Sequence, residues 1–269
     1  MAHFTVVGGK GFIGSELVSF LKLKGHSVFV PQKHDDKIFS EELGIVVYCA
    51  GHGDCQNNPA KVVESNLTYL SNVVEKSHFE KLVYLSSTRV YMGIEDSEEC
   101  SNLLVEYSDQ RKLFNLTKLA AEELILRTSK NAAIIRPSNV YGLALNSPLF
   151  LPSITRDAIL KGEVNMYVSP EYEKDYVSVV DVVTAIEKIS LMDITDKVIN
   201  IASGVNVSAG EIAAILQSNT GCKVNWHKNT LDDYFPRTNI EIAKRKLHLK
   251  PAHVLDDLQR MIVAFKDSL

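Results

Sequence analysis

The sequence predicts an α/β fold, built on a doubly wound parallel sheet with a smaller, discontinuous C-terminal lobe. In the first half of the chain, short β-rich runs alternate with longer helical stretches, which is the order of stacked βαβ units. Several runs, such as GIVVYCA at 44–50, are continuously apolar, as expected for strands buried on both faces of a sheet. After Gly142 the pattern loosens, which favours a second lobe made of separate segments.

The elements follow one another in a regular order. Strands are predicted at 3–7, 27–30, 44–50, 81–87 and 132–137, with helices at 12–25, 59–77 and 114–124. The last of these helices, FNLTKLAAEEL, is rich in Leu, Ala, Glu and Lys and contains no Gly or Pro. Further helices are predicted at 154–162, 181–192, 211–220 and 255–266, and further strands at 175–179 and 197–203.

The composition limits the class of partner. With 269 residues, of which 45% are hydrophobic and 23% charged, the chain has the length and composition of an ordinary globular protein. A net charge of -4 and a pI near 6.1 argue against nucleic acid or an anionic membrane and favour a small molecule. The four scattered cysteines, and the lack of a signal-peptide or membrane-spanning run before the first helix, favour a cytoplasmic location. The histidines lack metal-ligand spacing, so no metal is predicted.

A glycine loop follows the first strand. Gly8, Gly11 and Gly14 have G-x-x-G-x-x-G spacing between a strand and an amphipathic helix. Glycine allows a tight turn and close approach of the backbone to a pyrophosphate, and a helix N-terminus supplies unpaired N–H groups. A tight structural turn is the other interpretation, but the strand and helix around the loop favour a dinucleotide site in a Rossmann-type domain. Phe12 and Ile13 belong to the same segment.

The end of the second strand bears on the choice of cofactor. An acidic residue that binds the adenosine ribose is often found there, and this chain instead has Gln32 and Lys33. Together with Lys10 of the glycine loop, Lys33 would meet a 2'-phosphate with positive charge, which favours NADP over NAD. Lys33 as a solvated surface charge is the alternative, and Asp35 and Asp36 just beyond keep NAD open.

Seven motifs occur in an order and spacing that resemble one family. They are GGKGFIG (8–14), YCAG (48–51), LSSTRVY (85–91), KLAAEE (118–123), RPSNVYG (136–142), KDYVSVVDV (174–182) and VINIASG (198–204). In these motifs the chain resembles the extended short-chain dehydrogenase/reductases, and more narrowly the NAD(P)-dependent epimerases, dehydratases and reductases of nucleotide sugars. The resemblance implies an NAD(P)-binding domain at 1–142 and 176–201 and a nucleotide-sugar-binding lobe at 143–175 and 202–269. It adds Ala50, Gly51 and Lys118 to the expected cofactor contacts.

The family's chemistry rests on a Ser or Thr and a Y-x-x-x-K pair beside the nicotinamide. The Tyr is the acid/base, the Lys lowers its pKa and holds the nicotinamide ribose, and the Ser/Thr orients the reacting oxygen. Carried onto this sequence, Ser87 takes the Ser/Thr position and Lys118 the Lys position. The tyrosine position is occupied by Phe114, which keeps the ring but cannot exchange a proton. Losing such a group commonly costs about 10²–10⁴ in rate.

Three explanations of Phe114 stay open. Another group or a water could transfer the proton, with Tyr107 the nearest phenol in sequence. An engineered Tyr→Phe exchange could have silenced the site to trap a complex. A natural binding protein could keep cofactor and sugar without redox chemistry. If instead the motif register were wrong, Phe114 would be ordinary core, but LAAEE and the distance from Lys118 to Arg136 anchor the register.

The residues after Ser87 narrow the expected reaction. Thr88 and Arg89 stand there, where the resemblance implies Asp-Glu for 4,6-dehydratases and a Cys for the double epimerase-reductases, so neither reaction is expected. A 4-ketoreductase or a C4 epimerase remains. The short connection before GIVVYCAG and the expected NADP favour the reductase.

The resemblance also implies substrate contacts and a partner. Nucleotide-sugar contacts are expected from Ser87, Thr88, Asn139, Lys174 and Arg237, although Lys174 and Arg237 could equally be surface charges. Relatives pair as homodimers through the helices that correspond to 62–76 and to the Lys118 helix, and the same pairing is expected here.

Overall fold

A parallel sheet of six strands forms the centre of the computed structural model, which describes residues 1–33, 35–128, 130–144, 147, 149–193, 195–227 and 233–268. Its strands, in spatial order, are β2 (Ser27–Phe29), β1 (His3–Val7), β3 (Ile45–Tyr48), β4 (Lys81–Leu85), β5 (Ala132–Pro137) and β9 (Val198–Ile201). The order reverses between β1 and β3, as in a doubly wound Rossmann sheet. The predicted fold class is confirmed.

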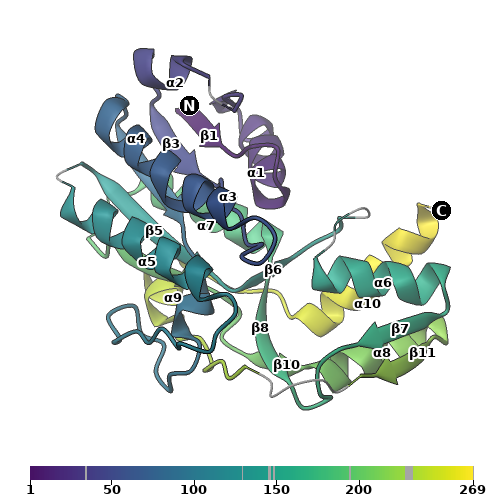
Figure 1. Ribbon diagram of the computed structural model, residues 1–269. Coiled ribbons are helices and arrows are strands. Elements are labelled where there is room, and N and C mark those ends of the chain that lie inside the picture. Colours follow the sequence, from purple (N-terminus) through teal and green to yellow (C-terminus); the bar gives the residue numbers. More distant parts are fainter. Residues whose placement is uncertain are drawn as a thin grey trace.

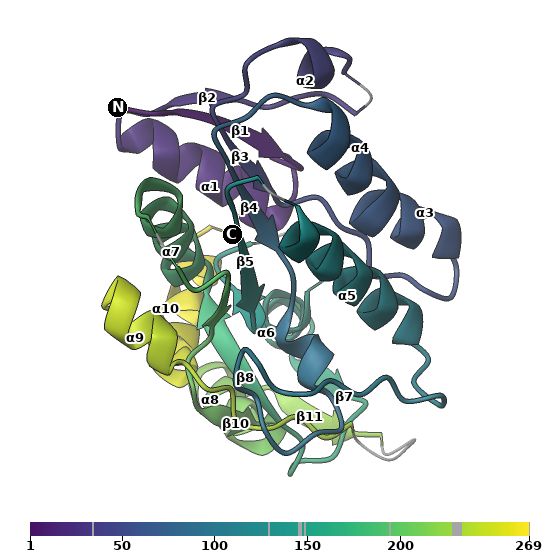
Figure 2. The ribbon, with the colours of Figure 1, turned by 90° about the vertical axis from the view of Figure 1, so that its left-hand side faces the viewer.

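Helices cover both faces of this sheet (Figure 2). One face carries α1 (Phe12–Leu23), α7 (Val179–Leu191) and α9 (Glu241–Leu247), and the other carries α3 (Pro59–Val63), α4 (Tyr69–Lys76) and α5 (Lys112–Arg127). The short α2 (Lys37–Ser40) lies beside α4. Each face has its own apolar core, with Leu17 and Ile186 in the first and Val73 and Ile125 in the second. Burial on both faces explains why the strands read as continuous apolar runs.

A second group of elements lies to one side of the large sheet (Figure 1). It contains a three-stranded sheet of β10 (Asn206–Ser208), β8 (Glu173–Ser178) and β6 (Asn139–Tyr141), and a two-stranded sheet of β11 (Lys223–Trp226) and β7 (Glu163–Met166). Three helices, α6 (Phe150–Leu160), α8 (Ala209–Thr220) and α10 (Val254–Asp267), pack around a separate core that includes Leu216 and Leu258. The domain boundaries stay a prediction, and parts of the predicted lobe, namely Leu145, Asn146, Pro148, 228–232 and Leu269, lie outside the described residues.

Two departures from regular helix were not predicted and shape the site. The helix expected at 59–77 contains a π-helical segment at Glu64–Thr68, between α3 and α4. A 3-10 turn at Thr88–Tyr91 follows β4. Within the described part of the chain, no helix is both long enough and apolar enough to cross a bilayer.

Candidate functional site

The glycine loop joins β1 to α1 in a conformation that only glycine accommodates. Gly8 has φ +82°, and a Cβ on it would lie 2.6 Å from the Ala50 backbone nitrogen. A Cβ on Gly14 would collide with the Gly8 carbonyl oxygen. The loop is closed by a hydrogen bond from the Gly11 N–H to the Gly8 carbonyl, 3.0 Å. The first turn of α1 is therefore open to an anionic ligand, as the motif predicts.

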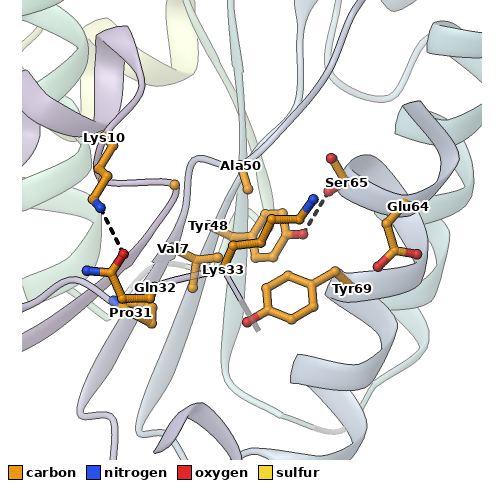
Figure 3. Close-up of a pocket in the computed structure, with 12 residues that line it drawn as sticks. Val7, Lys10, Pro31, Gln32, Lys33, Tyr48, Ala50, Glu64, Ser65 and Tyr69 are labelled. Atoms are coloured by element: carbon orange, nitrogen blue, oxygen red, sulfur yellow. Dashed lines mark hydrogen bonds between the residues drawn. The ribbon is translucent and has the colours of Figure 1, made fainter. Parts of the chain in front are cut away.

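A pocket of about 290 Å³ lies on one side of this loop, beyond the end of β2. Figure 3 shows Lys10 donating a 2.8 Å hydrogen bond to the Gln32 side chain on one wall, with Glu64, Ser65 and Tyr69 on the other. Between these walls lie Lys33, Ala50 and the ring of Tyr48, whose hydroxyl donates to the Ser65 carbonyl at 2.7 Å. The Tyr69 hydroxyl is buried and has no hydrogen-bond partner among the described residues.

A larger cleft of about 640 Å³ lies on the other side of the loop, and Ala50 lines both spaces. The predicted residues that line the cleft are Gly11, Phe12, Ile13, Gly14, Ala50, Gly51, Ser87, Phe114, Lys118, Asn139 and Lys174. A dinucleotide lying across the glycine loop would therefore reach from the pocket into the cleft. Among the described residues, the charged groups lining the cleft are Arg111, Lys118 and Lys174, with no carboxylate. The lining is thus suited to an anionic ligand.

Lys118 lies on α5, with its ammonium group buried at the floor of the cleft. Its Nζ donates a 2.8 Å hydrogen bond to the Leu85 carbonyl at the end of β4. Burial lowers the pKa of Lys118 to about 8, although Glu122 and Cys49 act in the opposite direction. Burial likewise raises the pKa of the Cys49 thiol to about 12, against the effect of Lys118. The thiol therefore stays protonated while Lys118 can change its charge near neutral pH.

Phe114 lies one helical turn before Lys118 and its ring faces two cations. The Lys118 Nζ is 5.7 Å from the ring centroid, and the central guanidinium carbon of Arg111 is 5.1 Å from it. Both distances are within the range of cation–π contacts. Tyr107, the alternative phenol, is 92% exposed and does not line the cleft. A tyrosine at position 114 would have both cations beside its phenol. Tyr107, the nearest tyrosine in sequence, does not supply a phenol to the cleft in its place.

Ser87 is held at the cleft by a buried polar network beneath it. Its neighbour Ser86 donates a hydrogen bond to Glu122, which also receives two bonds from Arg136, at 2.6 and 3.1 Å. Ser87 itself accepts a 3.1 Å bond from the Arg89 N–H and so caps the 3-10 turn. The network fixes the backbone of residues 86–89, and with it the direction of the Ser87 side chain.

The expected substrate residues are placed differently from one another. Asn139 lines the cleft, and its amide donates to the Asp175 carbonyl at 2.8 Å. The Lys174 ammonium contacts two aromatic rings, 4.9 Å from the centroid of Tyr172 and 5.0 Å from that of Phe235.

The other two expected substrate residues are not part of the cleft lining. Thr88 is buried and faces a smaller hollow shared with Asn139 and Phe235. Arg237 is exposed, and its guanidinium donates to the Gly204 carbonyl. No group of three or more His, Cys, Asp or Glu side chains able to hold a metal ion occurs in the described ranges.

Several residues of both spaces were not anticipated from the sequence. In the pocket these are Tyr48, Glu64, Ser65 and Tyr69, and in the cleft Cys49, Arg111, Leu149, Phe150, Tyr172 and Tyr176. Cys49 and Tyr48 could have been found, because they end an apolar strand at the edge where ligands bind in doubly wound sheets. Tyr69 depends on the π-helical segment, and Arg111 depends on loop packing, so neither leaves a local signal.

Comparison with known proteins shows the family of the chain and relatives that share its fold. The family described as NAD dependent epimerase/dehydratase matches residues 4–202. dTDP-D-glucose 4,6-dehydratase of Dictyostelium discoideum is 23% identical over 259 residues, covering 77% of this chain and 60% of that protein, which is less than two thirds of its length. GDP-6-deoxy-D-talose 4-dehydrogenase of Aggregatibacter actinomycetemcomitans is 22% identical over 276 residues, covering 96% of this chain and 86% of that one.

Solved structures share the fold over nearly the whole chain. MoeE5 in complex with UDP-glucuronic acid and NAD has a TM-score of 0.86 and 22% identity, covering 99% of this chain and 100% of that one. A tyrosine-to-phenylalanine mutant of UDP-glucuronic acid 4-epimerase from Bacillus cereus, in complex with UDP-4-deoxy-4-fluoro-glucuronic acid and NAD, has a TM-score of 0.82 and 18% identity, covering 99% and 100%. At such identities the likeness establishes the fold.

Proposed function

The chain belongs to the NAD-dependent epimerase/dehydratase family, and on that basis we propose that it is an NAD(P)-dependent oxidoreductase of a nucleotide sugar, and more specifically a 4-ketoreductase. The observation that carries the proposal is a single cleft lined by the end of the glycine loop, Ser87, Phe114 and Lys118. These are the residues that a hydride-transfer site of this kind needs, except for the phenol hydroxyl.

The residues present fit a dinucleotide. The glycine loop leaves room for a pyrophosphate, and the buried, unpartnered Tyr69 hydroxyl can hydrogen-bond a base or ribose in the 290 Å³ pocket. When bound, a reduced nicotinamide supplies the hydride for reduction of a ketone. The protein's part is to hold the carbonyl oxygen with the Ser87 hydroxyl, and to hold the cofactor ribose with the Lys118 ammonium.

NADP is the proposed cofactor, although the two solved relatives named above are complexes with NAD. Lys10, Gln32 and Lys33 line the pocket near the end of β2. The Asp35 carboxylate does not line the pocket, and it accepts a 3.1 Å hydrogen bond from the Lys37 N–H. The wall of the pocket beside β2 therefore offers positive charge to a 2'-phosphate, and Glu64 lies on the opposite wall (Figure 3).

The residues around Ser87 support reduction rather than dehydration. Elimination of water needs an acid and a base beside the sugar, and no carboxylate lines the described cleft. Arg89, which follows Ser87 and Thr88, is paired with Asp109 at 2.8 Å. The name of the Aggregatibacter relative, a 4-dehydrogenase, describes the same hydride transfer in the reverse direction.

Turnover of NADPH with a 4-keto nucleotide sugar tests the proposal. Phe114→Tyr is expected to raise kcat by about 10²–10⁴, because it adds a proton donor beside two cations. Tyr107→Phe is the matched control, since it removes an exposed phenol outside the cleft, and it should leave the rate unchanged. If Phe114→Tyr gives no gain on a substrate shown to bind, the assignment of 114 as the missing acid/base position fails.

Two alternatives give different results in the same assay. A C4 epimerase would interconvert two nucleotide sugars without net consumption of NADPH. A non-catalytic binding protein, which Phe114 itself favours, would bind cofactor and sugar, and the unaltered protein would turn over neither.

A homodimer is part of the proposal. Helices α3, α4 and α5 lie side by side on one face of the molecule (Figure 2), and exposed apolar residues on this face include Val63 and Leu116. A reducing, cytoplasmic location also stays a prediction, supported by four cysteines that are all free thiols.

A further inference from the structure

Arg111 lines the cleft, and none of the roles proposed above involves its side chain. It immediately precedes α5, and its guanidinium lies 5.1 Å from the centroid of the Phe114 ring and lines the cleft. One guanidinium nitrogen is 3.3 Å from the place where a Cβ on Gly53 would lie. A 2.6 Å hydrogen bond between Gln56 and Gln110 ties the Gly53 loop to the segment that carries Arg111. The guanidinium is therefore held between a loop and an aromatic ring at the mouth of the reacting site.

No carboxylate of the described residues forms a salt bridge with this guanidinium. Asp109 pairs with Arg89 at 2.8 Å, and Asp233 lies 3.6 Å from the same arginine. Asp109 also accepts a 2.8 Å hydrogen bond from the backbone N–H of Arg111, but not from its side chain. In the described part of the chain, the Arg111 side chain has no ion pair or hydrogen bond. Burial and the nearby charge of Arg89 lower the pKa of Arg111, while Cys55, Asp109 and Asp233 act in the opposite direction. The residue is nonetheless exposed, so its guanidinium is accessible to an anionic ligand.

The anions of the cofactor and nucleotide have other partners. The glycine loop and the first turn of α1 are the proposed site of the pyrophosphate, and Lys174 is a cation that lines the cleft from the second group of elements. Arg111 is next to Phe114, the position that marks the reacting carbon. The anion that Arg111 binds should therefore be a group on the sugar, close to the reacting carbon.

We propose that Arg111 binds a carboxylate on the sugar, so that the substrates are nucleotide-linked hexuronic acids. In a hexuronic acid the carboxylate carbon is attached to C5, the ring atom next to C4, which places it within reach of a group beside the reacting centre. A guanidinium can hold such a carboxylate with two parallel hydrogen bonds. This inference rests on the proposed function, since it identifies the substrate class of the same site.

Binding of matched sugar pairs tests the inference without requiring turnover. The probes are UDP-glucose with UDP-glucuronic acid, and GDP-mannose with GDP-mannuronic acid, each titrated calorimetrically into the NADP-saturated protein. In at least one pair the acid should bind about tenfold or more tightly than the neutral sugar. Arg111→Gln should remove this preference while changing the affinity for the neutral sugar by less than about threefold. Arg111→Lys should keep part of it.

The controls separate the possible failures. Lys112→Gln removes the adjacent cation, which does not line the cleft, and should keep the preference. Thermal unfolding and NADP affinity verify that each variant is folded. Equal affinity within both pairs, or an unchanged preference in Arg111→Gln, would overturn the role of Arg111 while leaving the proposed function intact. Failure of all four sugars to bind would instead remove the proposed function, and this inference with it.

Discussion

The buried ammonium of Lys118 should make the stability of the folded protein depend on pH. Burial lowers its pKa from 10.5 to about 8, and the Leu85 carbonyl is its hydrogen-bond acceptor. The difference between these pKa values corresponds to about 3 kcal/mol of unfavourable free energy for the charged form in the folded protein. Because the unfolded chain holds the proton more tightly, the free energy of unfolding rises with pH between about 8 and 10.5.

Lys118→Met isolates this contribution. It keeps an unbranched side chain of similar length and removes the titrating group. Between pH 7 and pH 10, the stability of the unaltered protein should increase by about 2 kcal/mol relative to Lys118→Met. Urea unfolding of both proteins without cofactor, at intervals of one pH unit, measures the difference. Lys112→Met corrects for the general effect of removing an ammonium from the same helix.

A stability difference that stays constant from pH 7 to pH 10 would refute the reasoning, because it would mean that Lys118 titrates alike in the folded and unfolded protein. A difference that changes in the opposite direction would mean that the ammonium is stabilised by the fold. In that case the cleft would already hold a partner for it, and the interpretation of Lys118 as a charge reserved for a ligand would be wrong.

Two further predictions concern the cofactor and the assembly. Lys33→Glu should reduce the affinity for NADP relative to NAD by about tenfold, because a carboxylate repels a 2'-phosphate. Fluorescence titration with both cofactors measures this ratio of affinities. Lys37→Glu, which lies outside the pocket lining, should leave the ratio unchanged. Leu116→Asp places a charge on the exposed face of α5 and should halve the mass measured by light scattering. Leu104→Asp, at another exposed leucine, should leave the mass unchanged. A monomer mass for the unaltered protein would contradict the proposed dimer.

The parts of the site that depend on backbone constraints could be predicted from the sequence. Gly8 and Gly14 are required because a Cβ on either would clash with neighbouring backbone. Lys118 lies four residues after Phe114 on a helix, so the two share one face whatever the rest of the fold does. Ser87 follows a buried strand at the edge of the sheet where ligands bind. These rules are local or follow from topology, and the structure brings Ser87, Phe114 and Lys118 to one cleft.

The parts that depend on tertiary packing could not be predicted. Tyr69 reaches the pocket from the end of a π-helical segment, whose extra residue changes the direction of every side chain after it. Arg111 lines the cleft beside Gly53, in a segment that the hydrogen bond between Gln56 and Gln110 joins to the Gly53 loop across 54 residues of sequence. Strands of three residues, such as β6 and β10, are too short to show a period. Arg237 is directed toward the Gly204 carbonyl by loop packing.

The energy of the contact between Phe114 and Lys118 can be compared with the cost of burying the Lys118 ammonium. A cation–π contact with the ring is worth about 0.5–2 kcal/mol, whereas burying the Lys118 ammonium costs about 3 kcal/mol. Packing between Phe114 and Lys118 therefore does not by itself account for a buried charge at this position, and an apolar side chain would give a more stable unliganded protein. The loss of stability that such a charge causes in the free protein can be offset by an anionic ligand that binds only the folded state. The buried cation beside Phe114 is therefore best explained by the molecules that the cleft binds.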